Sequence, residues 1–269
     1  MSSILGLLAT LLYLAATGRL IYVLNRASHV QQTPARPPLI TLWGTAVVLH
    51  ALVLATEIFT PTGLSLGFFH ALSMVAWLIA LILLVASLRR PMEVLGVALL
   101  PFAAVALALG MAFPQATLIS NLMDPGLKAH ILLSLLAYSL LMIAAFQAIL
   151  LATQNRHLHN HHPGGFVRAL PPLQFMESLL FQVIGLGFLL LSASLVTGFM
   201  FLDDIFAQHL VHKTALSIAA WCLFALLLWG RWQFGWRGRI AVRWTLGGFV
   251  ALMLAYFGSK LVLELLLQR

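Results

Sequence analysis

The chain has 269 residues, of which 62% are hydrophobic and only 8% are charged. A soluble domain carries about 25% charged residues, so this composition excludes a water-soluble protein and indicates an integral membrane protein. The formal net charge of +8 does not indicate nucleic-acid binding, because the basic residues lie mostly in short connections between apolar segments, where they set membrane topology.

Eight apolar segments of bilayer length follow one another along the chain. They cover residues 3–24, 39–58, 67–88, 91–113, 126–153, 177–201, 209–229 and 243–266. Their apolar runs are continuous rather than alternating, which excludes a strand barrel, and the first is too long for a cleaved signal peptide. The sequence therefore predicts an all-α, polytopic protein whose residues 1–269 form a single membrane domain.

Lys and Arg are concentrated in every second connection. The connections after the first, third, fifth and seventh segments carry Arg26 and Arg36, Arg89 and Arg90, Arg156 and Arg168, and Arg231, Arg237, Arg239 and Arg243. Connections 59–66 and 114–124 have neither residue, and 202–208 carries Asp203 and Asp204 instead. By the positive-inside rule, we expect both termini on the outer, periplasmic side.

Ionisable residues inside a membrane are costly and are functional candidates by default. With the predicted topology, His50, Glu57, His70, His130, His209, His212 and Lys213 all fall in the outer half or at the outer end of their helices. The cytoplasmic half has almost no such group apart from Glu93 and Glu177 near helix starts. The distribution predicts an outward-facing polar site.

Helical spacing groups these residues on shared faces. The sets are Trp43, His50 and Glu57; His70, Met74 and Trp77; and a polar stripe of His130, Ser134 and Tyr138. Neutral imidazole is a good ligand for haem iron, and haem in a helical bundle takes axial histidines from facing helices. The candidate cofactor-binding residues are His130, His212, His70, His50, Ser134, Tyr138 and Trp77. Zinc is the alternative, with Asp203, Asp204 or Glu57 as further ligands.

Simpler interpretations stand beside these. A single histidine in a polytopic protein often serves as an interhelical hydrogen-bond partner. The cluster of His157, His159, His161 and His162 is typical of a solvated cytoplasmic loop. The aromatic and basic residues of 229–244 could form a flat surface against which a cofactor stacks (a cofactor shelf). They also suit an aromatic belt with basic anchors at the inner membrane interface.

Three stretches carry a resemblance to a known family. LKAHILLSLLAYSLLMIAAFQAILL (128–151), LLLSASLVTGFMF (189–201) and HKTALSIAAWCLFALLLWGRWQFGWRGR (212–239) resemble the cytochrome c assembly proteins of the CcsA, CcmC and HemX group. The small eight-helix HemX-like and YpjD-like branch of bacterial inner-membrane proteins is the most similar. The resemblance implies haem handling on the outer face, with His130 at the position of the first external histidine ligand.

The chain also departs from the larger family members. The connection before the seventh helix is only FLDDIFAQ, so the tryptophan-rich WWD segment of the haem lyases is missing. The last helix ends in LELLLQR, without the second external histidine, and Trp229 stands where the family has a further intramembrane histidine. Synthetase activity is therefore not expected, and no catalytic residue is assigned.

The sequence thus predicts a haem-binding or haem-relay protein of the bacterial inner membrane. Non-covalent b-type haem is the expected cofactor, with His130 and His212 as iron ligands, and membrane lipid and other cytochrome c assembly proteins are the expected partners. Two alternatives stay open. One is a proton-coupled transporter of a small solute that uses Glu57, His50 and His130, and the other is a non-catalytic membrane scaffold.

Overall fold

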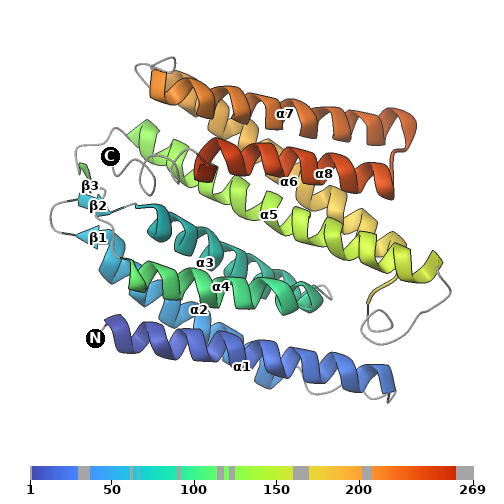
Figure 1. Cartoon of the computed structure of the whole chain (residues 1–269), viewed down its shortest axis with the longest axis horizontal. Helices are drawn as coiled ribbons and strands as arrows, with labels where there is room; N and C mark the ends of the chain where they lie inside the picture. The colour runs from blue at the N-terminus through green and yellow to red at the C-terminus, as the bar shows by residue number, and fades with distance from the viewer. Residues whose placement is uncertain are drawn as a thin grey trace. The chain divides into compact units, whose positions relative to one another are not determined.

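The computed structural model describes residues 2–29, 37–60, 63–65, 67–89, 92–113, 118–120, 125–159, 170–201 and 208–258. Within these residues, eight helices are long and apolar enough to cross a membrane (Figure 1). They contain α1 (Ser2–His29), α2 (Pro37–Ile58), α3 (Phe68–Ser87), α4 (Gly96–Ala112), α5 (Pro125–His159), α6 (Leu173–Phe201), α7 (Gln208–Phe234) and α8 (Arg239–Met253). The fourth span begins before α4, at Glu93, and the eighth extends beyond α8 to Phe257. The predicted helical architecture with eight candidate spans is confirmed.

Several helices extend beyond the predicted apolar segments, because hydropathy marks the bilayer-length core and not the ends of backbone hydrogen bonding. α5 runs on to His159, so that His157 and His159, predicted in a loop, lie in its last turn. α8 continues after Met253 into a π-helical turn, η3 (Leu254–Gly258). His161, His162 and residues 259–266 of the predicted eighth helix lie outside the described residues.

Two connections predicted as plain loops contain short strands. β1 (Phe59–Thr60), β2 (Gly63–Ser65) and β3 (Leu118–Ser120) form an antiparallel sheet in the order β1-β2-β3. Strands of two or three residues are too short to leave a period-two pattern in the sequence, so the sequence does not predict them. They join the connection after α2 to the connection after α4.

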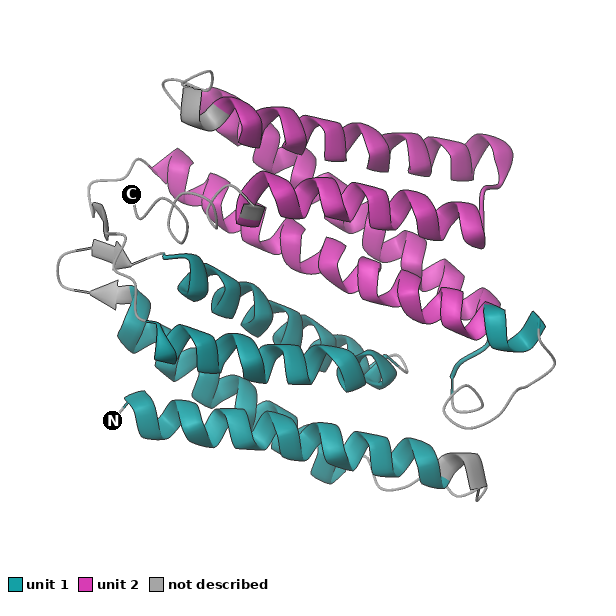
Figure 2. Cartoon of the chain, viewed as in Figure 1, with its two compact units in different colours: residues 1–121, 156–172 teal, residues 122–155, 173–269 magenta. Residues whose placement is uncertain are grey.

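The chain divides into two compact units (Figure 2). Unit 1 comprises residues 1–121 and 156–172 and contains α1 to α4 and a short 3-10 turn, η1 (Glu93–Leu95). Two indoles tie α2 to α3 in unit 1: Trp43 Nε1 donates to the Ala80 carbonyl at 3.1 Å, and Trp77 Nε1 donates to the Val47 carbonyl at 2.9 Å. A backbone carbonyl of each helix thus accepts the indole hydrogen bond of the other helix's tryptophan.

Unit 2 comprises residues 122–155 and 173–269 and contains α5 to α8. Gly235 and Gly238, with φ of 66° and 59°, form the tight turn from α7 to α8, where a side chain would strain the backbone. The Gly238 N–H donates to the Glu177 carboxylate of α6 at 2.6 Å. This bond places an acidic group at the start of α8, where the helix dipole favours it.

Candidate functional site

His130 lies in the second turn of α5, and its ring is half-buried. Its Nδ1 is 2.8 Å from the backbone carbonyl oxygen of Ser194 in α6. A carbonyl oxygen only accepts hydrogen bonds, so Nδ1 carries the hydrogen and the neutral ring presents its lone pair at Nε2. Within the described part of the chain, Nε2 has no hydrogen-bond partner. The ring is therefore oriented through one nitrogen and open at the other.

Small hydroxyl groups surround this hydrogen bond. Ser134 Oγ donates to the His130 carbonyl at 2.7 Å and also lies 2.7 Å from Ser194 Oγ. Thr197 Oγ1 donates to the same Ser194 carbonyl that accepts the histidine N–H, at 2.9 Å. These contacts fix α5 against α6 beside the ring. Metal-binding histidines are held in the same way, by a carbonyl or carboxylate at the nitrogen that does not bind the metal.

Tyr138 continues the polar stripe of α5 but contacts another helix. Its hydroxyl donates to the Leu252 carbonyl, at the end of α8 and beside the π-helical turn. The Tyr138 ring also packs against Tyr256 and Phe257 of that turn, with ring centroids 5.6 Å and 6.0 Å away. The residues of this stripe therefore contact two different helices. His130 and Ser134 contact α6, whereas Tyr138 contacts α8.

His212, the other predicted iron ligand, is exposed in the first turns of α7. α5 and α7 run in the same direction in unit 2, so both histidines lie toward the same end of that unit (Figure 1). No hydrogen bond or ion pair among the described residues joins the two rings. The side chain of His209 and both Asp203 and Asp204 lie outside the described part.

His50 of unit 1 is completely buried and is bonded at both ring nitrogens. Its Nδ1 lies 3.2 Å from the Tyr13 hydroxyl of α1, and its Nε2 lies 2.9 Å from the Ser73 hydroxyl of α3. The ring therefore links three helices and has no nitrogen left for a ligand. This is the environment of an interhelical tie.

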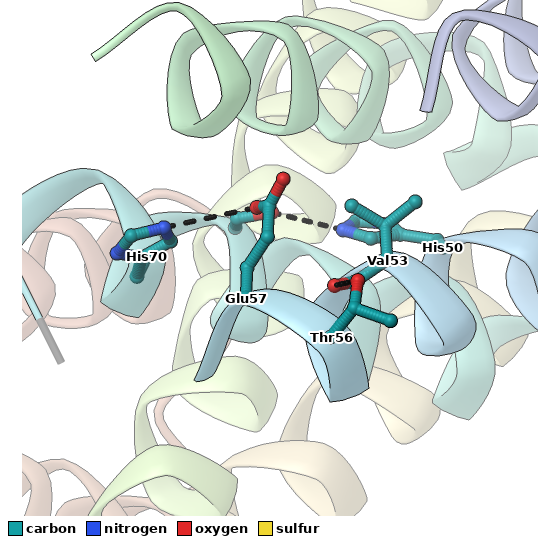
Figure 3. Close-up of polar contacts among 6 residues, drawn as sticks. His50, Val53, Thr56, Glu57 and His70 are labelled. Atoms are coloured by element: carbon teal, nitrogen blue, oxygen red, sulfur yellow. Dashed lines mark hydrogen bonds and ion pairs between the residues drawn. The ribbon is translucent and has the colours of Figure 1, made fainter. Parts of the chain in front are cut away.

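His70 and Glu57 form a second polar contact in unit 1 (Figure 3). His70 Nε2 lies 3.7 Å from Glu57 Oε2 at the point where α2 ends and α3 begins. Trp77, predicted on the same face as His70, uses its indole N–H for the Val47 carbonyl. In unit 1 the predicted candidates His50, His70 and Trp77 thus each make a separate contact between α2 and α3, to Ser73, Glu57 and Val47, rather than one cluster.

The aromatic and basic residues between α7 and α8 contact one another. Trp236 stacks on Trp244 with centroids 5.8 Å apart, and Arg231 lies over the Phe181 ring at 4.6 Å. Trp232 is 83% exposed. Exposed indoles beside arginines are typical of a membrane interface, so this arrangement favours the aromatic belt over a cofactor shelf.

Four residues that support the histidines through hydrogen bonds were not predicted from the sequence: Ser194, Thr197, Tyr13 and Ser73. In the sequence, each is a single hydroxyl-bearing residue in an apolar helix, and nothing nearby marks it as functional. The available signal was weak: Ser194 and Thr197 are three residues apart, and this spacing places them on one helical face. Their contacts to histidines depend on which helices pack together, and the spacing within one helix does not contain that information.

Comparison with known proteins then identifies the family. The model of the cytochrome c assembly protein family matches residues 39–267. The chain belongs to this family. The match extends over most of the predicted helices and includes every candidate site residue. The family assignment made from the three stretches of sequence is confirmed, and membership supports a haem-related role in cytochrome c biogenesis.

Individual relatives agree with this assignment. The inner membrane protein YpjD of Escherichia coli strain K12 is 34% identical over 223 residues, which cover 82% of this chain and 84% of YpjD. An uncharacterized 28.8 kDa protein of Azospirillum brasilense is 34% identical over 51% of this chain and 52% of its own length. The cytochrome c biogenesis protein CcsA of Crocosphaera subtropica is 24% identical over 82% of this chain and 85% of CcsA.

No solved structure matches the chain. The relatives and the eight apolar helices together establish a multi-pass protein of the bacterial inner membrane, as predicted. Tryptophan-rich and C-terminal features of the larger family members would fall on residues 202–207 and 259–269, which lie outside the described part.

Proposed function

We propose that the protein binds or relays haem non-covalently through His130. The observation that carries this proposal is the hydrogen bond from His130 Nδ1 to the Ser194 carbonyl, which leaves Nε2 as an open imidazole ligand. Family membership supports haem as the cofactor, and an axial imidazole is an ordinary way to hold b-type haem. The relative named as a cytochrome c biogenesis protein supports other assembly proteins as partners.

The residues of unit 2 are suited to supply one axial histidine to a haem. The His130 residue is half-buried, so part of it is open to a ligand. The Phe201 ring lies against Gly126, one turn before His130, and a β-carbon at Gly126 would collide with that ring. An aromatic ring against the first turn of α5, one turn before the proposed ligand, suits a porphyrin edge. His212, exposed at the same end of unit 2, is the proposed second ligand. When bound, haem would supply a redox-active iron, while this chain would supply the ligand nitrogen and its orientation.

The proposed site faces the periplasm. The support is the alternation of basic and non-basic connections in the sequence, which makes both termini external. Single cysteines introduced at the exposed Ser3 and Gln233, in a Cys222→Ser background, test this orientation. We expect an impermeant maleimide to label intact cells at position 3 and to label position 233 only after permeabilisation. The reverse pattern would invert the proposed topology.

Haem titration of the purified protein tests the function. We expect a haem-type absorbance spectrum that shifts on reduction. In the His130→Ala variant, affinity should fall at least about a hundredfold, because loss of a supporting group alone costs about 10–100-fold in metal affinity. His159→Ala is the matched control, since His159 is an exposed histidine of the same helix, and it should bind haem as the native chain does.

Two results would contradict the proposal. One is the absence of haem absorbance after loading the native protein. The other is unchanged haem affinity in the His130→Ala variant. If that variant loses thermal stability while no ligand binding changes, the scaffold alternative is favoured instead.

A further inference from the structure

Glu57 and His70 form a contact between ionisable side chains in unit 1, and one ring nitrogen of His70 has no hydrogen-bond partner among the described residues. His50 has partners at both ring nitrogens. His70 is equally deep in the protein, with 5% of its side chain exposed, but only its Nε2 faces a partner, the Glu57 carboxylate at 3.7 Å. Its Nδ1 is buried and has no hydrogen-bond partner. Buried polar atoms in proteins are nearly always paired, so this nitrogen requires a further explanation.

The geometry assigns a hydrogen to one nitrogen and a lone pair to the other. A carboxylate accepts hydrogen bonds and attracts positive charge, so the neutral His70 ring favours the tautomer with its N–H at Nε2, toward Glu57. The lone pair is then at Nδ1, the unpartnered atom. We propose that Glu57 and His70 form an intramembrane proton-binding site, in which Nδ1 of His70 takes up the proton and the Glu57 carboxylate stabilises the resulting imidazolium.

The surroundings of the pair favour this role. Glu57 is 21% exposed, so the pair lies near the surface at the end of unit 1 where α2 ends and α3 begins (Figure 3). Proton uptake breaks an O–H bond of a hydronium ion of the solvent and forms an N–H bond at Nδ1, so the pair passes from one negative charge to neutrality. A neutral ion pair is less costly to bury in apolar surroundings than an isolated charge.

The described elements around Glu57 and His70 contribute no further titratable side chain to the proposed proton-binding site. α4, β1 and β2, which pack near the pair, carry no titratable side chain. From α1, the nearest such group is Tyr13, which is bonded to His50, two turns along α2 from Glu57. Glu93 of η1 follows the opposite end of α3. The proposal does not depend on haem binding in unit 2.

The test follows the protonation of His70 in the full-length protein. The chain is labelled with ¹⁵N-histidine and reconstituted in nanodiscs of phosphatidylethanolamine and phosphatidylglycerol, and His70→Gln identifies the His70 signal. Spectra are recorded from about pH 8 to about pH 5, and we expect the native His70 ring to change from one to two ring protons within this series. Glu57→Gln should weaken proton binding at least about tenfold, since a single opposite charge at 4–6 Å typically changes it by one to three decades.

Two variants make the result specific. Glu93→Gln removes the other carboxylate of unit 1 and should leave the His70 titration unchanged. Glu57→Asp retains the charge and should keep most of the proton affinity, which separates a charge effect from a folding defect. A His70 ring that stays neutral throughout this pH range in the native protein would overturn the proposal. So would a Glu57→Gln variant that titrates as the native chain does.

Discussion

His50 of unit 1 and His130 of unit 2 both lie in helices that are long and apolar enough to cross a membrane, yet their rings are held in different ways. His50 is fully buried, and hydroxyls of two other helices occupy both its nitrogens. His130 is half-buried, and a backbone carbonyl holds one nitrogen while the other has no hydrogen-bond partner among the described residues. The first arrangement satisfies the ring within the fold, and the second leaves it able to bind a ligand.

The comparison shows that the use of each ring nitrogen is more informative than the position of a histidine in the sequence. Both residues are single histidines in apolar helices, and hydropathy treats them alike. A histidine bonded at both nitrogens stabilises helix packing, whereas one oriented by a carbonyl at Nδ1 is prepared for coordination at Nε2. We therefore expect substitutions of these residues to separate stability from haem binding.

The largest effect on stability is expected for His50→Ala. The substitution leaves the Tyr13 and Ser73 hydroxyls without their partner in a buried interface, and it opens a cavity between three helices. A loss of about 3 kcal/mol in the free energy of unfolding is expected from two unpaired polar groups and the cavity. Unfolding in mixed detergent micelles measures it. His130→Ala, which removes one hydrogen bond, should cost only about 1 kcal/mol, and equal losses would remove the distinction between the two histidines.

A smaller effect is expected for Ser134→Ala in unit 2. The substitution removes the hydroxyl that links the His130 carbonyl to Ser194, so the ring loses part of its orientation but keeps its ligand nitrogen. We expect about a tenfold weaker haem affinity, measured by spectrophotometric titration. Ser139→Ala is the control, because Ser139 Oγ also donates to a carbonyl of α5 but lies away from His130. Equal effects of the two substitutions would mean that Ser134 acts only on general helix stability.

The smallest effect is expected for Trp77→Phe. The indole N–H of Trp77 donates to the Val47 carbonyl, so its loss should lower the free energy of unfolding by about 1 kcal/mol and leave haem affinity unchanged. The same two measurements apply as for the histidines. A reduced haem affinity in this variant would instead support the cofactor-binding role that the sequence predicts for Trp77.

Sequence alone predicted the helices because bilayer-length apolar runs are strong signals in a chain with 8% charged residues. It also selected His130 from its family position and its polar stripe. It did not predict that Ser194 and Thr197 support His130, or that Tyr13 and Ser73 enclose His50. Those contacts join residues on different helices, and hydropathy carries no information on which faces meet.

The short strands were missed for a related reason. Their pairing, for example Leu64 with Ile119, connects segments distant in the chain. The polar stripe of α5 was correctly recognised as a stripe, but its division between α6 at His130 and α8 at Tyr138 is a property of the packed unit. Local periodicity therefore predicted which residues share a face, and the structure was needed to identify what each face contacts.

The most direct test of the account is chemical rescue of a His130→Gly variant loaded with haem. Because the site is half-exposed, free imidazole can enter the space left by the missing side chain. If His130 Nε2 is an axial ligand, the variant should lose the native haem spectrum and regain it when imidazole is added, with unchanged helix content by circular dichroism. A variant that keeps the native spectrum without imidazole would show that His130 does not bind the iron and would contradict the account.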